Sequence, residues 1–312
     1  MTENSFKIAG RTIGPHEPPY LVAELSANHN CDLSRALAVL EAAAAAGADA
    51  IKIQTYTADT ITLDSDRPEF QINSGPWQGR SLHDLYEEAH TPWAWHEPLF
   101  EKGRELGLAV FSTPFDASAV DFLEALEAPA YKIASFEIVD LPLIARVART
   151  GKPIILSTGM ATLAEIEAAV VTVRNTSASP LLVLHCISGY PTPVEDCNLA
   201  TIPDLAERLG VAIGLSDHTM SDEVAIAAVA LGAVVVEKHV TLARADGGPD
   251  AAFSYEPDEF AQLAASLRRA WQARGYVSYQ RAASEEGNVA FRRSLFVVAD
   301  VAAGERFSEW NL

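Results

Sequence analysis

The chain has 312 residues, of which 49% are hydrophobic and 21% are charged, so it can bury a large core in roughly one to two domains. Its formal net charge is −19, and a surface this acidic repels phosphate backbones, which argues against a nucleic-acid partner. No apolar run approaches the roughly 20 residues of a membrane span, and the N-terminus lacks the basic-then-apolar pattern of a signal peptide.

The first expected element is a short hairpin over residues 6–14, FKIAGRTIG, which turns at Gly10. We interpret residues 1–18 as an N-terminal cap that plugs one mouth of a barrel. Eight apolar runs follow, and their length is typical of parallel strands that are covered on both faces. Nearly every run ends in polar residues: LVAELSANH, AIKIQTY, AVFSTPF, AYKIAS, PIILSTG, LLVLHCISGY, AIGLSDH and VVVEKHV.

Segments rich in Ala, Leu and Glu, with a helical period, separate these runs. Asp32 or Ser34 is the expected cap of the first helix, which ends at Gly47. Thr162 and Glu165 have the spacing of a capping box. Further helices are expected from HTPWAWHEPLF onward, at about 116–126, after Asp140-Leu141-Pro142, and at about 199–209, 221–231 and 257–273.

The second strand, at about 49–54, is followed by about 35 residues without a clear period, from Tyr56 to Thr91. A loop this long in a compact domain is usually a lid or a binding loop. Because it leaves the C-terminal end of a strand, we expect it to lie over the pocket. The alternative is a surface excursion that packs on its own side chains.

Eight strand-helix units over roughly 220 residues predict an α/β fold, a (β/α)8 TIM barrel that spans residues 19–275. Beyond it the sequence is polar until RRSLFVVADVAAGERFSEWNL, which reads as one strand followed by a glycine turn. We interpret residues 276–312 as a linker and the first strand of a further C-terminal domain. A single strand is not stable alone, so it either docks on the barrel or is the stump of that domain.

The active site of such a barrel lies at the C-terminal strand ends. This rule gathers a ring of polar side chains around one pocket: Glu24, Lys52, Gln54, Thr113, Lys132, Ser135, Ser157, Ser188, Tyr190, Ser216, His218, Glu237 and His239. His218 and His239 end neighbouring strands, and two imidazoles suit a divalent metal such as Mn²⁺ or Zn²⁺ with positions left for water or substrate. The alternative is that both histidines are hydrogen-bonded polar residues without a metal.

Lys52 and Lys132 interrupt apolar strands, where a charge is costly unless it is paired. Together with the ring hydroxyls they predict a cradle for a phosphate or a carboxylate, although each hydroxyl alone is also explained by turn or cap chemistry. Glu24 is expected to orient a sugar hydroxyl or shuttle a proton, or else to form a salt bridge with Lys52. Tyr190 is expected to contact a substrate or to pack in the core, and Asp250 in GGPDAAFS to fix a hydroxyl or a metal-bound water.

The three cysteines, Cys31, Cys186 and Cys197, are widely spaced, which predicts neither a disulfide framework nor a close metal pair. A reducing, cytoplasmic location is the natural interpretation. Cys186 lies within an apolar strand and is expected to be a core residue.

The chain resembles the sialic acid synthase family over nearly all of residues 5–312. The strings that carry the resemblance are AELSANHN, KIQTYTADTITLDSDRPEF, YEEAHTPWAWHEPLFEKGRELGL, FSTPFD, YKIASFEIVDLPLI, GKPIILSTGMATLAEIE, GLSDHT, EKHVTL and GGPDAAFSYEP. AELSANHN and DAAFSYEP favour the branch of the family that makes pseudaminic acid. Ser188, where neuraminate synthases tend to have Asn, and Cys31, in place of the glycine of NHNG, depart from the family pattern.

The resemblance implies a transferase that condenses phosphoenolpyruvate (PEP) with an N-acetylated amino sugar, here a 2,4-diacetamido-2,4,6-trideoxy hexose. It implies a divalent metal, Mn²⁺ before Mg²⁺ or Co²⁺, held by His218 and His239. It implies catalytic roles for Glu24, Lys132, His218 and His239, and substrate contacts from Lys52, Gln54, Thr113, Lys132, Ser135, Ser157, Ser188, Tyr190, Ser216 and Asp250. It also implies a homodimer in which a C-terminal antifreeze-like domain supplies an arginine to the partner's sugar.

Two other readings stay open. The first alternative is an N-acetylneuraminate or legionaminate synthase, which would catalyse the same condensation with a different sugar. The other alternative is a barrel that binds PEP or metal but has low activity, because the C-terminal domain is needed to close the site over the sugar. A metal hydrolase fits less well, because two lysines and a ring of hydroxyls indicate an anionic co-substrate.

Overall fold

The structure is a computed structural model that describes residues 5–312. The expected hairpin is confirmed: β1 (Phe6–Ile8) pairs with β2 (Arg11–Ile13) in antiparallel register. Gly10 lies in its turn at φ 85°, a conformation that glycine adopts without strain. Of the cap predicted over residues 1–18, residues 1–4 lie outside the part that the structure describes.

The predicted (β/α)8 barrel is also confirmed. Its eight strands are parallel and form a closed ring in the order β10-β3-β4-β5-β6-β7-β8-β9. The strands are β3 (Tyr20–Glu24), β4 (Ala50–Thr55), β5 (Ala109–Pro114), β6 (Tyr131–Ile133), β7 (Ile154–Ser157), β8 (Leu181–Cys186), β9 (Ala212–Asp217) and β10 (Val235–His239).

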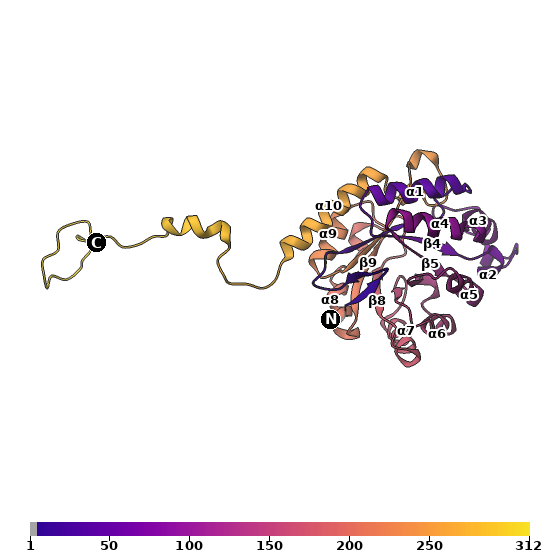
Figure 1. Cartoon of the computed structure of the whole chain (residues 1–312), viewed down its shortest axis with the longest axis horizontal. Helices are drawn as coiled ribbons and strands as arrows, with labels where there is room; N and C mark the ends of the chain where they lie inside the picture. Colours follow the sequence, from indigo (N-terminus) through magenta and orange to yellow (C-terminus); the bar gives the residue numbers. More distant parts are fainter. Residues whose placement is uncertain (1–4) are drawn as a thin grey trace. The chain divides into compact units, whose positions relative to one another are not determined.

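Helices cover the outside of this ring (Figure 1). As the sequence predicts, the Asp32 carboxylate accepts from Ser34 N at the start of the first one, and Thr162 and Glu165 form a reciprocal capping box. The barrel helices are α1 (Leu33–Ala45), α4 (Trp93–Leu106), α5 (Ala117–Ala125), α6 (Leu141–Ala148), α7 (Leu163–Thr176), α8 (Thr201–Leu209), α9 (Asp222–Ala230) and α10 (Pro257–Arg274).

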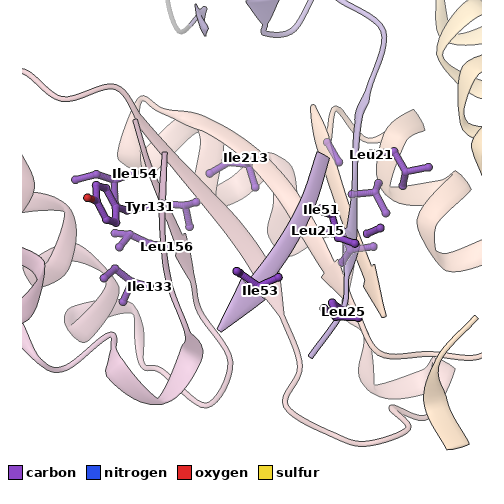
Figure 2. Close-up of a cluster of buried hydrophobic side chains, with 14 of the residues drawn as sticks. Leu21, Leu25, Ile51, Ile53, Tyr131, Ile133, Ile154, Leu156, Ile213 and Leu215 are labelled. Atoms are coloured by element: carbon purple, nitrogen blue, oxygen red, sulfur yellow. The ribbon is translucent and has the colours of Figure 1, made fainter. Parts of the chain in front are cut away.

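Successive strand residues alternate between two separate apolar clusters. The outer cluster joins strands to helices, and Figure 2 shows its strand residues Leu21, Leu25, Ile51, Ile53, Tyr131, Ile133, Ile154, Leu156, Ile213 and Leu215. The inner cluster contains alternate positions such as Val22, Phe111 and Ile155, together with the hairpin residues Ile8 and Ile13. The hairpin therefore fills the N-terminal end of the barrel interior, and the inward positions near the C-terminal ends carry the polar residues.

The segment between β4 and α4 has more structure than the sequence indicates. It contains α2 (Ala58–Ile61), the short helix η1 (Pro68–Phe70) and α3 (Leu82–Ala89). Helix α3 was missed because LHDLYEEA buries only Leu85 and so shows little apolar period. Trp77 lies within the segment, and its Nε1 donates to Pro249 O at 2.8 Å, which joins the segment to the loop after β10.

Residues Gly275–Leu312 form a second compact unit. The strand expected near Leu295 is wrong, since the described residues of this unit contain a 3-10 segment, η6 (Ala283–Phe291), and no strand. Phe296 is 72% exposed, and Val298 makes a single backbone bond, to Asn311 O. An isolated strand lacks the pairing that would stabilise it. Among the described residues, no helix is long and apolar enough to cross a membrane.

Candidate active site

Four charged side chains alternate in sign inside the barrel. Lys52 Nζ lies 2.6 Å from Glu24 Oε2 and 3.8 Å from Glu237 Oε1, and Lys132 Nζ lies 2.8 Å from the same Glu237 oxygen. None of the four is more than 4% exposed. They come from β3, β4, β6 and β10, at positions that point inward by the strand alternation.

Burial and neighbouring charges set the protonation of this cluster. Burial raises the pKa of Glu24, and the Lys52 ammonium opposes this rise. The pKa of Lys52 is raised, because the attraction of Glu237 and Glu24 outweighs its burial. Burial, reinforced by repulsion from Lys52, lowers the pKa of Lys132. With both carboxylates ionised the cluster is close to neutral, and protonation of Glu24 leaves it cationic and ready for an anion.

A chain of polar contacts leads from Glu24 to Asp250. Gln54 Nε2 donates to Glu24 Oε1 at 3.1 Å and to Ser26 Oγ at 3.3 Å, and Ser26 Oγ donates to Asp250 Oδ2. Asp250 follows β10, and its burial raises its pKa. The loops after β3 and β10 are thus joined at the rim, beside Glu24 and Gln54, which the sequence places there.

The two histidines lie side by side, with ring centroids 5.4 Å apart. His218 Nδ1 donates to Ile187 O at 2.9 Å, which leaves Nε2 as the nitrogen that a metal can reach when the ring is neutral, whereas the buried Nδ1 of His239 has no partner among the described residues. Burial, and then the positive charges of His218 and Lys52, hold the pKa of His239 well below its usual range. A neutral imidazole is the form that binds a metal.

The donor set fits a divalent metal with an incomplete protein shell. The described residues contain no group of three or more His, Cys, Asp or Glu side chains with metal-binding geometry. The protein therefore offers two imidazoles, one of them with an orphaned buried nitrogen. Such a pair leaves most coordination positions to water or substrate, which is the pattern of a catalytic site and not of a structural one.

Aromatic rings line the wall beside the histidines. The Tyr190 ring centroid lies 4.5 Å from that of His218, and the Phe253 centroid lies 5.1 Å from that of His239. Trp77 covers both, at 5.7 Å from Tyr190 and 6.3 Å from Phe253. This arrangement places the long segment after β4 against the mouth of the site.

The predicted hydroxyls lie at the same strand ends. Thr113 Oγ1 accepts from Lys52 Nζ at 3.4 Å, and Ser216 Oγ donates to Glu237 Oε1 at 3.3 Å. Ser135 and Ser188 meet at Gly159, where a Cβ would overlap with both hydroxyl oxygens. The remaining one, Ser157, ends β7, and its buried Oγ, like that of Ser188, has no hydrogen-bond partner in the described residues. Unpaired buried donors of this kind are suited to a ligand.

Three further residues lie at these strand ends or in the turn after one of them. The sequence analysis places Glu237 in the ring without a role, treats Cys186 as a core residue and does not single out Glu137. Glu237 is the shared partner of both lysines. Cys186 Sγ lies 3.5 Å from Ser135 Oγ and 3.9 Å from His218 Nδ1. Glu137, in the turn after β6, has a buried Oε2 without a partner among the described residues, and burial raises its pKa to about 7. The strand-end rule places Glu237 in the ring but does not reveal that it pairs with both lysines, and Glu137 lies beyond the strand.

Comparisons with known proteins give a consistent result. A family model described as the NeuB family matches residues 39–279. The pseudaminic acid synthase of Helicobacter pylori is 43% identical over 297 residues, or 95% of this chain and 87% of that enzyme. The N,N'-diacetyllegionaminic acid synthase of Campylobacter jejuni is 36% identical over 94% of this chain and 88% of that enzyme. The N-acetylneuraminic acid synthetase structure from Leptospira borgpetersenii, in complex with citrate, has a TM-score of 0.84 and 32% identity over 94% of this chain and 98% of that one.

Proposed function

The chain belongs to the NeuB family, and on that premise we propose that it is a pseudaminic acid synthase. It joins PEP to a 2,4-diacetamido-2,4,6-trideoxy hexose and releases a nine-carbon 2-keto acid and phosphate. The observation that carries this proposal is the higher identity to a pseudaminic acid synthase than to a legionaminic acid synthase at nearly equal coverage.

The charge cluster supports binding of PEP. Lys52 and Lys132 are the buried cations of the site, and both point into the barrel with the hydroxyls of Thr113 and Ser216 beside them. PEP carries a carboxylate and a phosphate, which such a cradle binds through charge-assisted hydrogen bonds. Burial raises the pKa of Glu24, and its protonated form would leave the two lysines with more positive charge for the anion.

We also propose that His218 and His239 hold a divalent cation, with Mn²⁺ as the first choice and Mg²⁺ or Co²⁺ as alternatives. The support is the close approach of the two imidazole rings, the neutral state of His239 and its orphaned Nδ1. When bound there, a divalent cation supplies Lewis acidity to the sugar aldehyde.

The reaction then follows from the groups that surround it. The C3 carbon of PEP forms a bond to the aldehyde carbon of the open-chain sugar, and positive charge develops at C2 of PEP. Water adds at C2, and phosphate leaves with cleavage of its C–O bond. Lys52 and Lys132 hold the phosphate and carboxylate in place, and Glu24 is positioned to exchange a proton with the sugar oxygen or with water. Positioning and charge stabilisation are the main catalytic terms in such a site.

The direct test is a measurement of phosphate release with Mn²⁺, PEP and a panel of amino sugars. We expect the trideoxy diacetamido substrate of the pseudaminic acid pathway to give the highest kcat/KM, and the precursors of legionaminate and N-acetylneuraminate to give lower values. A higher value with either of the other sugars would reassign the substrate, and no phosphate release with any sugar would count against the enzyme class.

We further propose a homodimer and a cytoplasmic location. The first is supported by the exposed apolar side chains of residues 275–312, which a partner subunit would cover. The second is supported by the thiols of Cys31, Cys186 and Cys197, none of which forms a disulfide in the described chain.

A further inference from the structure

A lysine and an aspartate are buried together on the outer face of the barrel, away from the pocket. Lys238 Nζ lies 2.7 Å from Asp217 Oδ2, and the two side chains are 0% and 1% exposed. They are register partners on β10 and β9. The same ammonium donates to Thr219 O and lies 4.2 Å from the centroid of the Tyr255 ring. The proposed reaction uses neither residue.

A gain in folding stability does not explain why an ion pair is buried here. Two charges that leave water lose a large hydration energy, and a buried ion pair can often be replaced by apolar residues without loss of stability. A hydrophobic pair would fit the apolar layer between β9, β10 and the helices that cover them. What an ion pair adds is a fixed geometry between two backbone positions.

Those two positions are the covalent neighbours of the site histidines. Asp217 precedes His218, and Lys238 precedes His239. Because successive strand side chains point to opposite faces, a tie on the outer face fixes the backbone from which the two imidazoles point inward. Asp217 Oδ1 also accepts from Thr219 N at 2.9 Å, so the pair holds the chain on both sides of His218. On the other strand, Tyr255, whose ring faces the Lys238 ammonium, donates its backbone N–H to His239 O at 2.8 Å.

We propose that the Lys238–Asp217 ion pair is a positioning device that sets the spacing of His218 and His239 for a divalent cation. The inference rests on the metal site of the proposed function. Lys238 and Asp217 are positioning residues, because they lie behind the histidines and act on the cation only through the backbone of β9 and β10.

The test measures Mn²⁺ binding by the full-length protein without substrates, by isothermal titration calorimetry and by electron paramagnetic resonance of the bound ion. The variant is D217N/K238M, which removes both charges together and so avoids an unpaired buried charge. The matched control is His96→Leu, which removes another buried polar contact of the sheet-helix layer, the 2.7 Å hydrogen bond between His96 Nε2 and Thr55 Oγ1. The thermal unfolding midpoint of each variant is measured in parallel.

We expect D217N/K238M to bind Mn²⁺ about 10-fold to 100-fold more weakly than the wild type, with an altered resonance spectrum, and His96→Leu to bind as the wild type does. Unchanged affinity in a folded D217N/K238M protein overturns the inference and leaves the metal site standing. An equal loss of affinity in His96→Leu also overturns it, because the effect would then be general destabilisation. A wild type that binds no Mn²⁺, or an H218A/H239A variant that binds as well as the wild type, overturns both the metal site and the inference.

Discussion

At the scale of single residues, the main feature of the site is that both lysines already have carboxylate partners. Lys132 and Lys52 share Glu237, and Lys52 also contacts Glu24. Removal of one partner of a buried pair leaves an uncompensated charge, which typically costs about 3–5 kcal/mol of stability. A test of the role of a lysine must therefore neutralise its carboxylate as well.

We predict that K132M/E237Q folds with near wild-type stability and loses about 10²-fold to 10³-fold in kcat/KM, because a cationic contact to the developing charge is missing. Phosphate release and thermal unfolding measure the two effects. The control is Lys152→Met, which removes the surface ion pair 2.6 Å from Glu124 and is expected to keep its activity. Full activity in the double variant would show that Lys132 does not serve the reaction.

The fold moves the pKa of Glu137 into a pH range in which unfolding can be measured. Burial raises its pKa from the ordinary 4.5 to about 7, so its neutral form is favoured in the folded state. Its contribution to stability is therefore fully present below about pH 4.5 and is lost as the pH rises through 7. A displacement of this size corresponds to about 3 kcal/mol.

The matching prediction compares the wild type with Glu137→Gln by urea unfolding at several pH values. Between about pH 4.5 and pH 8, the free energy of unfolding of the wild type should fall by up to about 3 kcal/mol relative to the variant, which cannot ionise at this position. Parallel pH profiles for the two proteins would show that Glu137 is not buried as described.

At the scale of elements, the segment from Tyr56 to Thr91 places Trp77 over Tyr190 and Phe253. Trp77→Ala removes this cover, and aromatic contacts of this kind contribute about 0.5–1.5 kcal/mol beyond their buried area. We expect the KM for the sugar to rise roughly fivefold, while the KM for PEP changes little because Lys52 and Lys132 are untouched. Steady-state kinetics with each substrate varied in turn will separate the two.

Trp77→Phe is the matched control, because it keeps a ring against Tyr190 and loses only the hydrogen bond to Pro249 O. It is expected to lie between the wild type and Trp77→Ala. An equal rise of both Michaelis constants in Trp77→Ala would indicate a general disturbance of the rim, and no rise would remove Trp77 from the sugar site.

The strands were predictable because their pattern is local. Apolar runs that end in polar residues located Glu24, Lys52 and His239 at one rim, and the alternation within each strand made them point inward. The string EKH also contains Lys238, which pairs with Asp217 on the neighbouring strand. That partner depends on the strand register, which the sequence alone does not reveal. The roles of Lys238 and Trp77 depend on such non-local contacts, and the pKa of Glu137 depends on its burial in the folded chain, so none of the three follows from the sequence.

At the scale of the whole molecule, residues Gly275–Leu312 form a unit whose apolar side chains face solvent, among them Tyr276 at 87% and Trp310 at 86% exposure. We predict that light scattering gives twice the mass of one chain, because a second copy covers these side chains. F296S/W310S should shift the population toward single chains. A monomeric wild type at micromolar concentration would contradict the proposed homodimer.

The hairpin closes the N-terminal end of the barrel. Ile8 and Ile13 pack with inner strand residues such as Val22 and Phe111 at the N-terminal end of the described interior, so the polar groups of the site face the opposite, C-terminal end. Substrates would then enter and products would leave at the same end of the barrel. Inorganic phosphate that stays bound would block the binding of the next PEP. We expect inorganic phosphate to inhibit competitively with PEP, because both anions would bind Lys52 and Lys132 while Phe6, Ile8 and Ile13, with the inner strand residues, pack the other end of the described barrel.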